Sequence, residues 1–321
     1  MNNALKPSTK RQRAISYILL IIGAFIWGSA FIFQKQGMDY IDPLAFNGIR
    51  NLMGSFVLIP FILISDKRKD REELEKEKKQ RKTLVKAGLI CGVCLAAAST
   101  VQQYALKYTS TGKVGFITTL YIIFVPIVGI FIGKRFRPVL WVSAVLAIVG
   151  LYVLCLKKGE GFTLRSGDWM ALACAFLFAF QILALDKYTP IVNPIKLASA
   201  EFFVCGVICC TLMLIFEKPT LSAILAAYIP LLYAGLLSTG VAYTFQAVAQ
   251  KHTNPVIASL IMSLESVFCV LTSWALLHEV MTKRELLGCA IIFIGIIVAQ
   301  LPDFKKKKPY KEPEIKEEPT E

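Results

Sequence analysis

Three ionisable side chains lie inside long apolar runs of the sequence: Arg50, Glu201 and Glu265. A charge in such a run is costly to bury and commonly marks a functional site. An arginine there could hold a carboxylate or a phosphate through two parallel hydrogen bonds. A glutamate could bind an amine or carry a proton. A buried ion pair that only fixes helix packing is the other interpretation, and the sequence leaves both open.

The depth of each charge within its run indicates which charges could pair. Arg50 and Glu201 each lie about seven residues into their runs, but from opposite ends, so at about 1.5 Å per residue they are offset by roughly 12 Å. Glu265 lies near the middle of its run, roughly 7 Å from the level of Arg50. An arginine side chain can bridge that distance. We therefore predict that Glu265, and not Glu201, is the partner of Arg50.

Further polar and aromatic side chains occur at interior depths of the same runs. They are Trp27, Thr100, Gln102, Tyr121, Gln181, Tyr243, Thr244 and Gln246. Together with the three charges they would form the mixed surface that binds small organic molecules. Hydrogen bonds between helices or ordinary aromatic packing would also account for each of them.

These side chains must be positioned by helices that cross a membrane. Of the 321 residues, 55% are hydrophobic and only 18% are charged, whereas about a quarter of the residues of a soluble domain are charged. Windows of the roughly 20 apolar residues that span a bilayer recur along the chain. There are ten, at 14–33, 43–64, 84–104, 114–132, 138–156, 167–185, 194–216, 226–247, 255–277 and 286–302. We predict an all-α polytopic membrane protein with ten transmembrane helices.

The basic residues predict the orientation of these helices. Lysine and arginine gather at 6–13, 67–86 and 305–316, and such residues are enriched on the cytoplasmic side. Both termini are therefore expected in the cytoplasm, with 303–321 as a disordered tail whose lysines touch anionic lipid. Tyr310 is the only aromatic residue within these three basic segments, which argues against a nucleic-acid partner despite a net charge of +14. The first apolar run lacks a clear cleavage site after it, so we expect a retained helix.

The hydrophilic segment 66–82 mixes charges of both signs at helical spacing. Glu72 and Lys76, Glu75 and Lys79, and Glu77 and Arg81 are each four residues apart. This spacing suits intrahelical ion pairs. A solvated cytoplasmic helix or a flexible loop is the plainer interpretation, and a regulatory or lipid-binding role is the alternative.

The sequence indicates no metal site, cofactor or catalytic motif. The nine cysteines lie mostly inside apolar runs, where a free thiol behaves as a small hydrophobe. No histidine accompanies the closest pair, Cys91 and Cys94. The sequence contains no nucleotide-binding loop and nothing that resembles HExxH or GxSxG. We therefore do not expect an enzyme.

The two halves of the chain resemble each other. At an offset of 151 residues Pro43 aligns with Pro194, and at 144 Gln102 aligns with Gln246. An offset of 145 then aligns Gly150 with Gly295. Because each repeat of five helices, 14–156 and 167–302, holds an odd number, the second must cross the membrane in the opposite sense. Inverted repeats of this kind are typical of secondary transporters, which bind their solute near the midplane.

The same register relates particular residues of interest. Arg50 is equivalent to Glu201, and Tyr121 is equivalent to Glu265. The small residues Gly129 with Gly133, and Ser143 and Gly150 with Gly288 and Gly295, predict close helix packing.

Several stretches resemble the EamA type of the drug/metabolite transporter superfamily. They are Ala105-Leu-Lys-Tyr-Thr-Ser-Thr, Gly240-Val-Ala-Tyr-Thr-Phe-Gln-Ala-Val-Ala-Gln, Ser263-Leu-Glu-Ser-Val-Phe and His278-Glu279. The resemblance implies a central cavity lined by helices 1–4 and 6–9, with helices 5 and 10 outside it. Ser266 and Lys134 depart from the proline and glutamate that are common in the family at these positions.

The sequence therefore predicts a secondary transporter that works by alternating access in the inner (plasma) membrane. Its partners would be a small metabolite, amino acid or drug-like solute, with protons as a candidate coupling ion, and export is the expected direction. A channel and an intramembrane enzyme are the alternatives, and the sequence does not distinguish a monomer from a homodimer.

Overall fold

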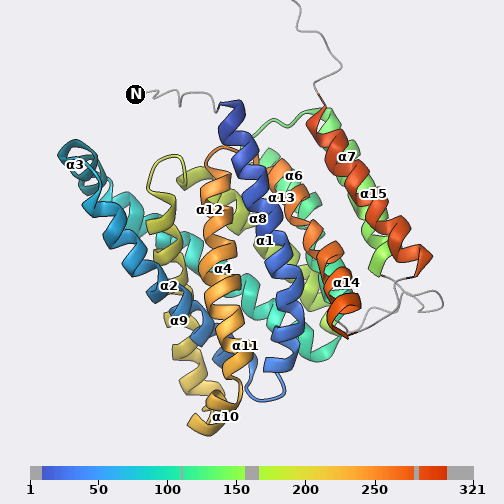
Figure 1. Cartoon of the computed structure of the whole chain (residues 1–321), viewed down its shortest axis with the longest axis horizontal. Coiled ribbons are helices and arrows are strands. Elements are labelled where there is room, and N and C mark those ends of the chain that lie inside the picture. Colours follow the sequence, from blue (N-terminus) through green and yellow to red (C-terminus); the bar gives the residue numbers. More distant parts are fainter. Residues whose placement is uncertain (1–8, 110, 156–165, 278–281, 302–321) are drawn as a thin grey trace, which may run out of the picture.

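The computed structural model describes residues 9–109, 111–155, 166–277 and 282–301, and within these ranges it contains helices and turns but no β-strand. Figure 1 shows the arrangement of the helices. They are α1 (Lys10–Gly37), α2 (Pro43–Lys67), α3 (Arg71–Lys79), α4 (Arg81–Tyr108), α5 (Thr111–Thr118), α6 (Tyr121–Phe131), α7 (Pro138–Cys155), α8 (Ser166–Tyr188), α9 (Pro194–Phe216), α10 (Leu221–Ala226), α11 (Tyr228–Leu232), the π-helix η1 (Tyr233–Tyr243), α12 (Thr244–Gln250), α13 (Pro255–Met262), α14 (Leu264–Leu277) and α15 (Lys283–Gln300).

Eight stretches of helix are long and apolar enough to cross a membrane, and two further apolar helices are shorter. The eight are Lys10–Gly37, Pro43–Lys67, Arg81–Tyr108, Lys113–Phe131, Ser166–Tyr188, Pro194–Phe216, Tyr228–Gln250 and Pro255–Thr272, and the shorter two are Pro138–Leu154 and Leu286–Ala299. The protein is therefore an all-helical polytopic membrane protein, as predicted. The ten apolar segments fall on the ten predicted windows. The predicted tail, 303–321, lies outside the described residues.

Proline sets the start of several of these helices. α2, α7, α9 and α13 each begin on a proline, whose missing N–H is not needed in the first turn. Asn193 and Asn254, which precede two of these prolines, accept hydrogen bonds from the exposed N–H groups of the first turn. These prolines thus mark the boundaries between successive helices.

Figure 1 shows α7 and α15 side by side at one edge of the bundle, and α2 with α9 toward the opposite edge. Between them, α4 packs on α8, and η1 with α12 packs on α1. In the repeat register α4 is equivalent to η1 with α12, and α8 is equivalent to α1. The second contact is therefore the copy of the first that a pseudo-two-fold axis would generate.

Small residues bring α7 and α15 into close contact, as predicted. A Cβ added at Gly288 would lie 2.8 Å from the carbonyl oxygen of Gly150, and one at Gly295 would lie 3.1 Å from that of Ser143. These two contacts are also equivalent in the repeat. The prediction is wrong for Gly133, which has φ +83° and ends α6, with no atom within 4 Å of its Cβ position.

Carboxylates tie α2 to α9 at both ends of the pair. At one end Asp66 accepts a hydrogen bond from Lys196 at 2.7 Å. At the other end Glu217, which directly follows α9, accepts hydrogen bonds from the backbone N–H groups of Leu44 and Ala45 at 2.9 and 2.7 Å. Glu217 therefore caps the first turn of α2. Asp66 and Glu217 are equivalent positions at the offset of 151 residues.

The charges of α3 pair differently from the prediction. Glu75 bonds Lys78 three residues on, and Glu77 bonds Lys69 and Lys196 at 2.7 Å each. Residues Asp66, Lys69, Glu77 and Lys196 form a closed network of ion pairs that we call the charge ring. Glu77 therefore ties α3 to α9 directly, and to α2 through Lys69 and Asp66. These partners are more buried than a solvated neighbour on its own helix.

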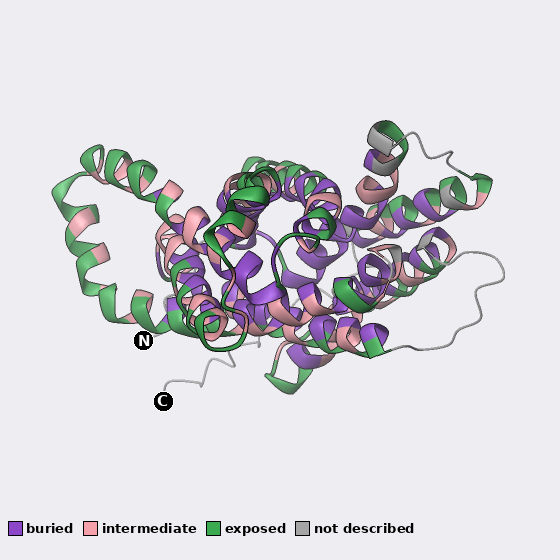
Figure 2. Cartoon of the chain, turned by 90° about the horizontal axis from the view of Figure 1, so that it is seen from below, coloured by how far each residue is buried: buried purple, intermediate pink, exposed green. Residues whose placement is uncertain are grey.

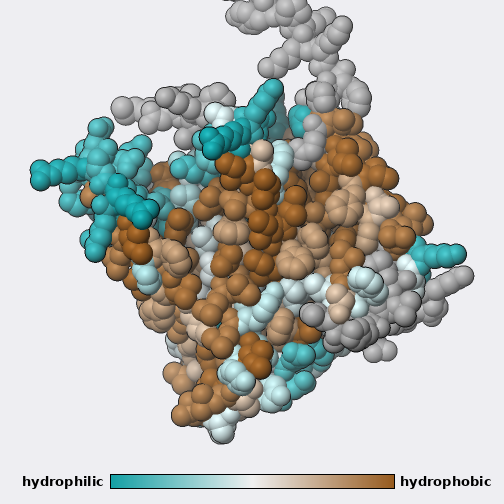
Figure 3. All heavy atoms as spheres, in the orientation of Figure 1, coloured by the Kyte–Doolittle hydropathy of each residue, from teal (hydrophilic) through white to brown (hydrophobic). Residues whose placement is uncertain are grey.

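The molecule buries a mixed core and exposes an apolar belt. Figure 2 shows buried residues gathered in the middle of the bundle and exposed ones around it. On the face shown in Figure 3 apolar side chains cover most of the helices, and hydrophilic ones gather around α3. Ile15, Ile18, Ile22 and Phe25 of α1 are among the exposed apolar side chains. Such a surface suits contact with lipid tails.

Candidate functional site

Two of the membrane-spanning segments are broken at equivalent positions. α5 ends at Thr118 and α6 begins at Tyr121, while α13 ends at Met262 and α14 begins at Leu264. Hydroxyl groups near the breaks bond to carbonyls of the preceding turn, as Thr119 does to Gly115 and Ser263 to Leu260. Such bonds compete with the helical ladder and bend it.

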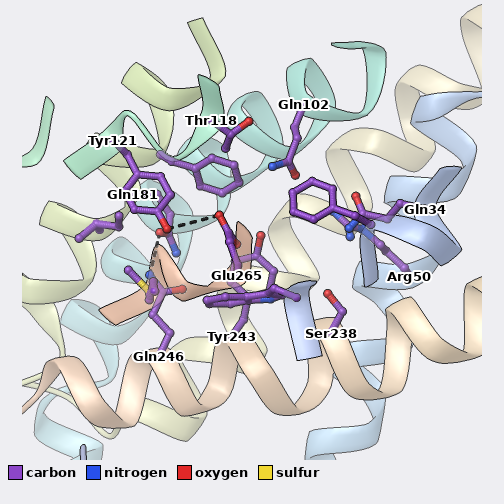
Figure 4. Close-up of a pocket in the computed structure, with 15 residues that line it drawn as sticks. Gln34, Arg50, Gln102, Thr118, Tyr121, Gln181, Ser238, Tyr243, Gln246 and Glu265 are labelled. Atoms are coloured by element: carbon purple, nitrogen blue, oxygen red, sulfur yellow. Dashed lines mark hydrogen bonds between the residues drawn. The ribbon is translucent and has the colours of Figure 1, made fainter. Parts of the chain in front are cut away.

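A cavity lies where the broken helices meet α1, α2, α4, α8, η1 and α12 (Figure 4). Eight of the eleven residues that the sequence singled out line it: Trp27, Arg50, Gln102, Tyr121, Gln181, Tyr243, Gln246 and Glu265. Other residues of its wall are Phe31, Gln34, Thr118, Phe178, Ile182, Ser238 and Met262. Among the described residues, none of α7, α9 or α15 contributes to this wall. The resemblance thus implied the outer place of α7 and α15 correctly, but it wrongly included α9.

The centres of water molecules can occupy about 40 Å³ of this cavity. Since one buried water needs roughly 10–15 Å³ by that measure, the cavity has room for a few waters. An organic solute would require it to widen.

Tyr121 and Glu265 meet at the wall of the cavity. The Tyr121 hydroxyl donates to Glu265 Oε1 at 3.4 Å, and the Glu265 carboxyl is buried (Figure 4). These two residues are equivalent in the sequence repeat. The cavity therefore lies where equivalent positions of the two halves meet.

Arg50 does not pair with Glu265, so the predicted ion pair is wrong. Arg50 Nε instead donates to Asn47 Oδ1 at 3.0 Å, one turn earlier on α2, and the guanidinium lies 5.9 Å from the centre of the Phe46 ring. Within the part of the chain that the structure describes, no carboxylate lies within 4.0 Å of the Arg50 side chain. Arg50 is therefore bound by Asn47 on its own helix, whereas the Glu265 carboxyl accepts a hydrogen bond from Tyr121.

Asn47 is in turn held by neighbours on α2, α4 and α9, the last through a hydrogen bond to Cys209 Sγ at 3.4 Å. Its side-chain amide donates to the hydroxyl groups of Ser99 at 2.8 Å and Thr100 at 3.0 Å, both on α4. Asn51 donates to Asn47 Oδ1 at 3.1 Å. The sequence analysis did not single out Asn47. Its spacing of three residues from a buried arginine, which brings two side chains onto one helix face, could have found it.

Glu201 lies behind the cavity wall. Gln181 Nε2 donates to Glu201 Oε1 at 2.8 Å, and Gln246 donates to Gln181 Oε1 at 3.2 Å. Gln246 also donates to Gln250 at 3.0 Å, so a line of amides leads from Glu201 along the wall. As predicted, Glu201 forms no direct pair with Arg50 in the structure.

The remaining predicted residues divide between wall and interior. Trp27 and Tyr243 pack edge to face, with ring centres 4.8 Å apart, and both line the cavity. Thr100 holds Asn47 and is not part of the wall. Thr244 is buried outside the wall.

The two departures from the family pattern each have a partner in this chain. The Ser266 hydroxyl lies 3.1 Å from that of Thr119 and so joins α14 to the break between α5 and α6. Lys134 pairs with Asp186, near the end of α8. A side chain of the opposite charge at position 134 would repel Asp186.

The EamA-like transporter family matches residues 14–156 and 165–300, which together make up most of the chain. The chain belongs to the EamA-like transporter family. The two matched segments correspond to the two helical halves described above. This protein is accordingly a membrane transporter for small molecules.

Relatives of similar length carry transporter names. An uncharacterized transporter of Archaeoglobus fulgidus is 29% identical over 90% of this chain and 87% of its own length. The uncharacterized transporter YoaV of Bacillus subtilis is 23% identical over 87% of this chain and 94% of its own length. The uncharacterized inner membrane transporter YedA of Escherichia coli K12 is 21% identical over 86% of this chain and 87% of its own length. These names agree with the expectation of a transporter and not an enzyme.

A solved crystal structure of a protein superposes on this chain with a TM-score of 0.71. The alignment covers 89% of this chain and 96% of the other, at 16% identity. At that identity the likeness supports the fold alone.

Proposed function

We propose that this EamA-family protein is a secondary transporter that exports a small polar or amphipathic organic solute by alternating access. The observation that carries the proposal is the cavity at two equivalent helix breaks, where residues of both halves meet. Discontinuous helices at a repeat interface form the solute and ion sites of secondary transporters. The repeats, 14–156 and 167–302, would exchange conformations so that the cavity opens to either side.

The residues of the cavity wall would bind the solute. Trp27, Gln102, Tyr121, Gln181, Tyr243 and Gln246 would provide polar and aromatic contacts, and Arg50 would provide positive charge. Glu265 would bind a solute amine or carry the coupling proton, with Tyr121 as its donor. Glu201 would act indirectly, through Gln181.

The distribution of basic residues supports the orientation. The lysines and arginines around 67–86 surround α3, which would lie with both chain termini on the cytoplasmic side of the plasma membrane. The charge ring would then stand at the cytoplasmic end of α2 and α9.

Reconstitution tests the proposed function. Proteoliposomes with the purified protein would be loaded with a mixed panel of metabolites, and their loss or uptake would be measured with and without a pH gradient. We expect saturable transport of a solute without ATP. We also expect the pH gradient to drive accumulation of that solute. Glu265→Gln should abolish the accumulation but leave exchange down the solute gradient.

Matched controls separate a coupling defect from misfolding. Ser55→Ala changes a buried side chain of α2 that bonds Ser199 away from the cavity, and it should transport as the wild type does. Linear dependence of flux on solute concentration would favour a channel. A requirement for ATP would contradict the proposal.

A further inference from the structure

We propose that the transported solute carries an oxyanion, a carboxylate or a phosphate, which Arg50 binds, and that Asn47 is the residue that positions Arg50 for this contact. The inference rests on the proposed function, since it concerns the same cavity. It adds the chemical class of the solute and a residue outside the cavity wall.

The first argument is the uncompensated charge of Arg50. The side chain is 2% exposed and ranks among the largest fully buried side chains. A buried charge is retained where a partner neutralises it, yet no carboxylate of the described residues reaches Arg50 within 4.0 Å. An anionic solute would provide the missing partner.

The second argument is the direction of the guanidinium. Among the described residues, Nε is the only guanidinium nitrogen that forms a hydrogen bond, and its partner is Asn47 Oδ1. Arg50 is part of the cavity wall, and Figure 4 places it at one end of the cavity beside Gln34. The two terminal nitrogens thus stay available as the paired donors that match a carboxylate or phosphate.

The third argument is a set of buried polar atoms around the cavity. Trp27 Nε1, Gln34 Oε1 and Ser238 Oγ belong to wall residues, are buried, and have no hydrogen-bond partner among the described residues. Buried polar atoms in native proteins are nearly always bonded. The Trp27 and Ser238 groups can donate to a bound oxyanion, and Gln34 can accept from a hydroxyl or amine of the same solute.

Asn47 acts through Arg50 and not on the solute. It is fully buried and is not part of the cavity wall. Ser99 and Thr100 of α4 fix its amide, so its oxygen is turned to Arg50 Nε. This contact fixes the plane of the guanidinium.

Matched solute pairs test the proposal in two assays. The probes are amino acids against their amides, other carboxylates against their amides, and phosphate monoesters against the parent alcohols. Transport is measured in proteoliposomes, and binding is measured as the rise in melting temperature of the purified protein. The two kinds of pair distinguish a carboxylate from a phosphate. We expect the oxyanion member of a pair to be transported and to stabilise the protein, at least tenfold more effectively than its neutral partner.

The variants separate positioning from structure. Arg50→Gln should remove the preference for oxyanions, and Arg50→Lys should restore it only in part because lysine lacks the paired donors. Asn47→Ala should raise the half-saturating concentration several-fold with a smaller change in maximal rate. Asn47→Asp retains the acceptor for Nε but neutralises Arg50, so it should fold normally and also lose affinity. If Asn47→Asp retains full affinity for the oxyanion, Asn47 has a structural role only and does not position Arg50.

The outcomes separate this inference from the proposed function. Oxyanion binding that depends on Arg50, without transport of any solute, would support the assignment of Arg50 as an oxyanion site and overturn the proposed function. Transport with equal preference for both members of each pair would support the function and overturn the inference. Neither transport nor stabilisation by any oxyanion would overturn both.

Discussion

Arg50 and Glu201 occupy equivalent positions in the two halves, yet their surroundings differ. Arg50 is held by Asn47 of its own helix, and the equivalent position in the second half is Ala198. Glu201 is held by Gln181 of α8, and the equivalent position in the first half is Ala30. Each charge therefore has a polar partner that the other half lacks. Arg50 keeps its donors for the cavity, whereas Glu201 uses its oxygen inside the protein.

The most direct test of this difference between Arg50 and Glu201 is to neutralise each charge in turn. Arg50→Gln should lower the transport rate at low solute concentration by about tenfold or more, because hydrogen bonds to a charged group contribute roughly 1.5–3 kcal/mol. Glu201→Gln keeps an oxygen for Gln181 and should stay within about twofold of the wild type. Initial rates in proteoliposomes measure both. Equal losses would mean that the two halves contribute equally to the solute site.

The second equivalent pair, Asp66 and Glu217, extends the comparison to stability. Glu217→Ala removes the cap of α2 and should lower the free energy of unfolding by about 1–2 kcal/mol, the usual cost of a lost cap. Thermal unfolding of the purified protein measures the loss. Glu217→Gln keeps one acceptor oxygen and should lose less. A change in solute preference without a loss of stability would contradict this structural role.

Removing the partner of Glu201 should have a smaller effect. Gln181→Ala should destabilise the protein by about 1 kcal/mol, within the range for hydrogen bonds between membrane helices. A double-mutant cycle with Glu201→Ala, which removes the acceptor oxygen, measures the coupling of the two side chains. A coupling energy of zero would show that the amide of Gln181 does not hold Glu201.

The charge ring should give the smallest effect, and it depends on pH. Burial raises the pKa of Glu77, but the hydrogen bonds from Lys196, Lys69 and Asn193 lower it by a larger amount. The pKa of Glu77 therefore lies below its usual value of 4.5. Its stabilisation is therefore complete above that pH and is lost as pH falls through the lowered pKa.

The matching variant is Glu77→Gln. We expect it to cost about 1 kcal/mol or less at neutral pH, as for other partly exposed ion pairs, and to match the wild type in acid. Thermal unfolding from pH 7 down to pH 3 measures both. A cost that persists unchanged at pH 3 would exclude the ionised carboxylate as its source.

The sequence predicted most of the helices and most of the cavity wall. Proline at the start of a helix and polar groups deep in apolar runs are local patterns, so they can be read without coordinates. The partner of Arg50 could not be predicted in the same way. Depth along the membrane placed Glu265 within reach, but the direction of the side chain depends on Asn47 and on the α4 hydroxyl groups that hold it. The contact of Tyr121 with Glu265 likewise depends on how distant segments pack, as the contact of Thr119 with Ser266 beside it shows.

The contact of Tyr121 with Glu265 bears on how such a protein can arise. Two identical five-helix chains assembled in opposite orientations would place the same residue twice at this point, two tyrosines or two glutamates. Two glutamates there would repel each other when ionised. A single chain that carries both halves can diverge, so one half supplies a donor and the other an acceptor. Covalent fusion thus permits a chemistry at the centre of the molecule that a symmetrical dimer of the same half could not have.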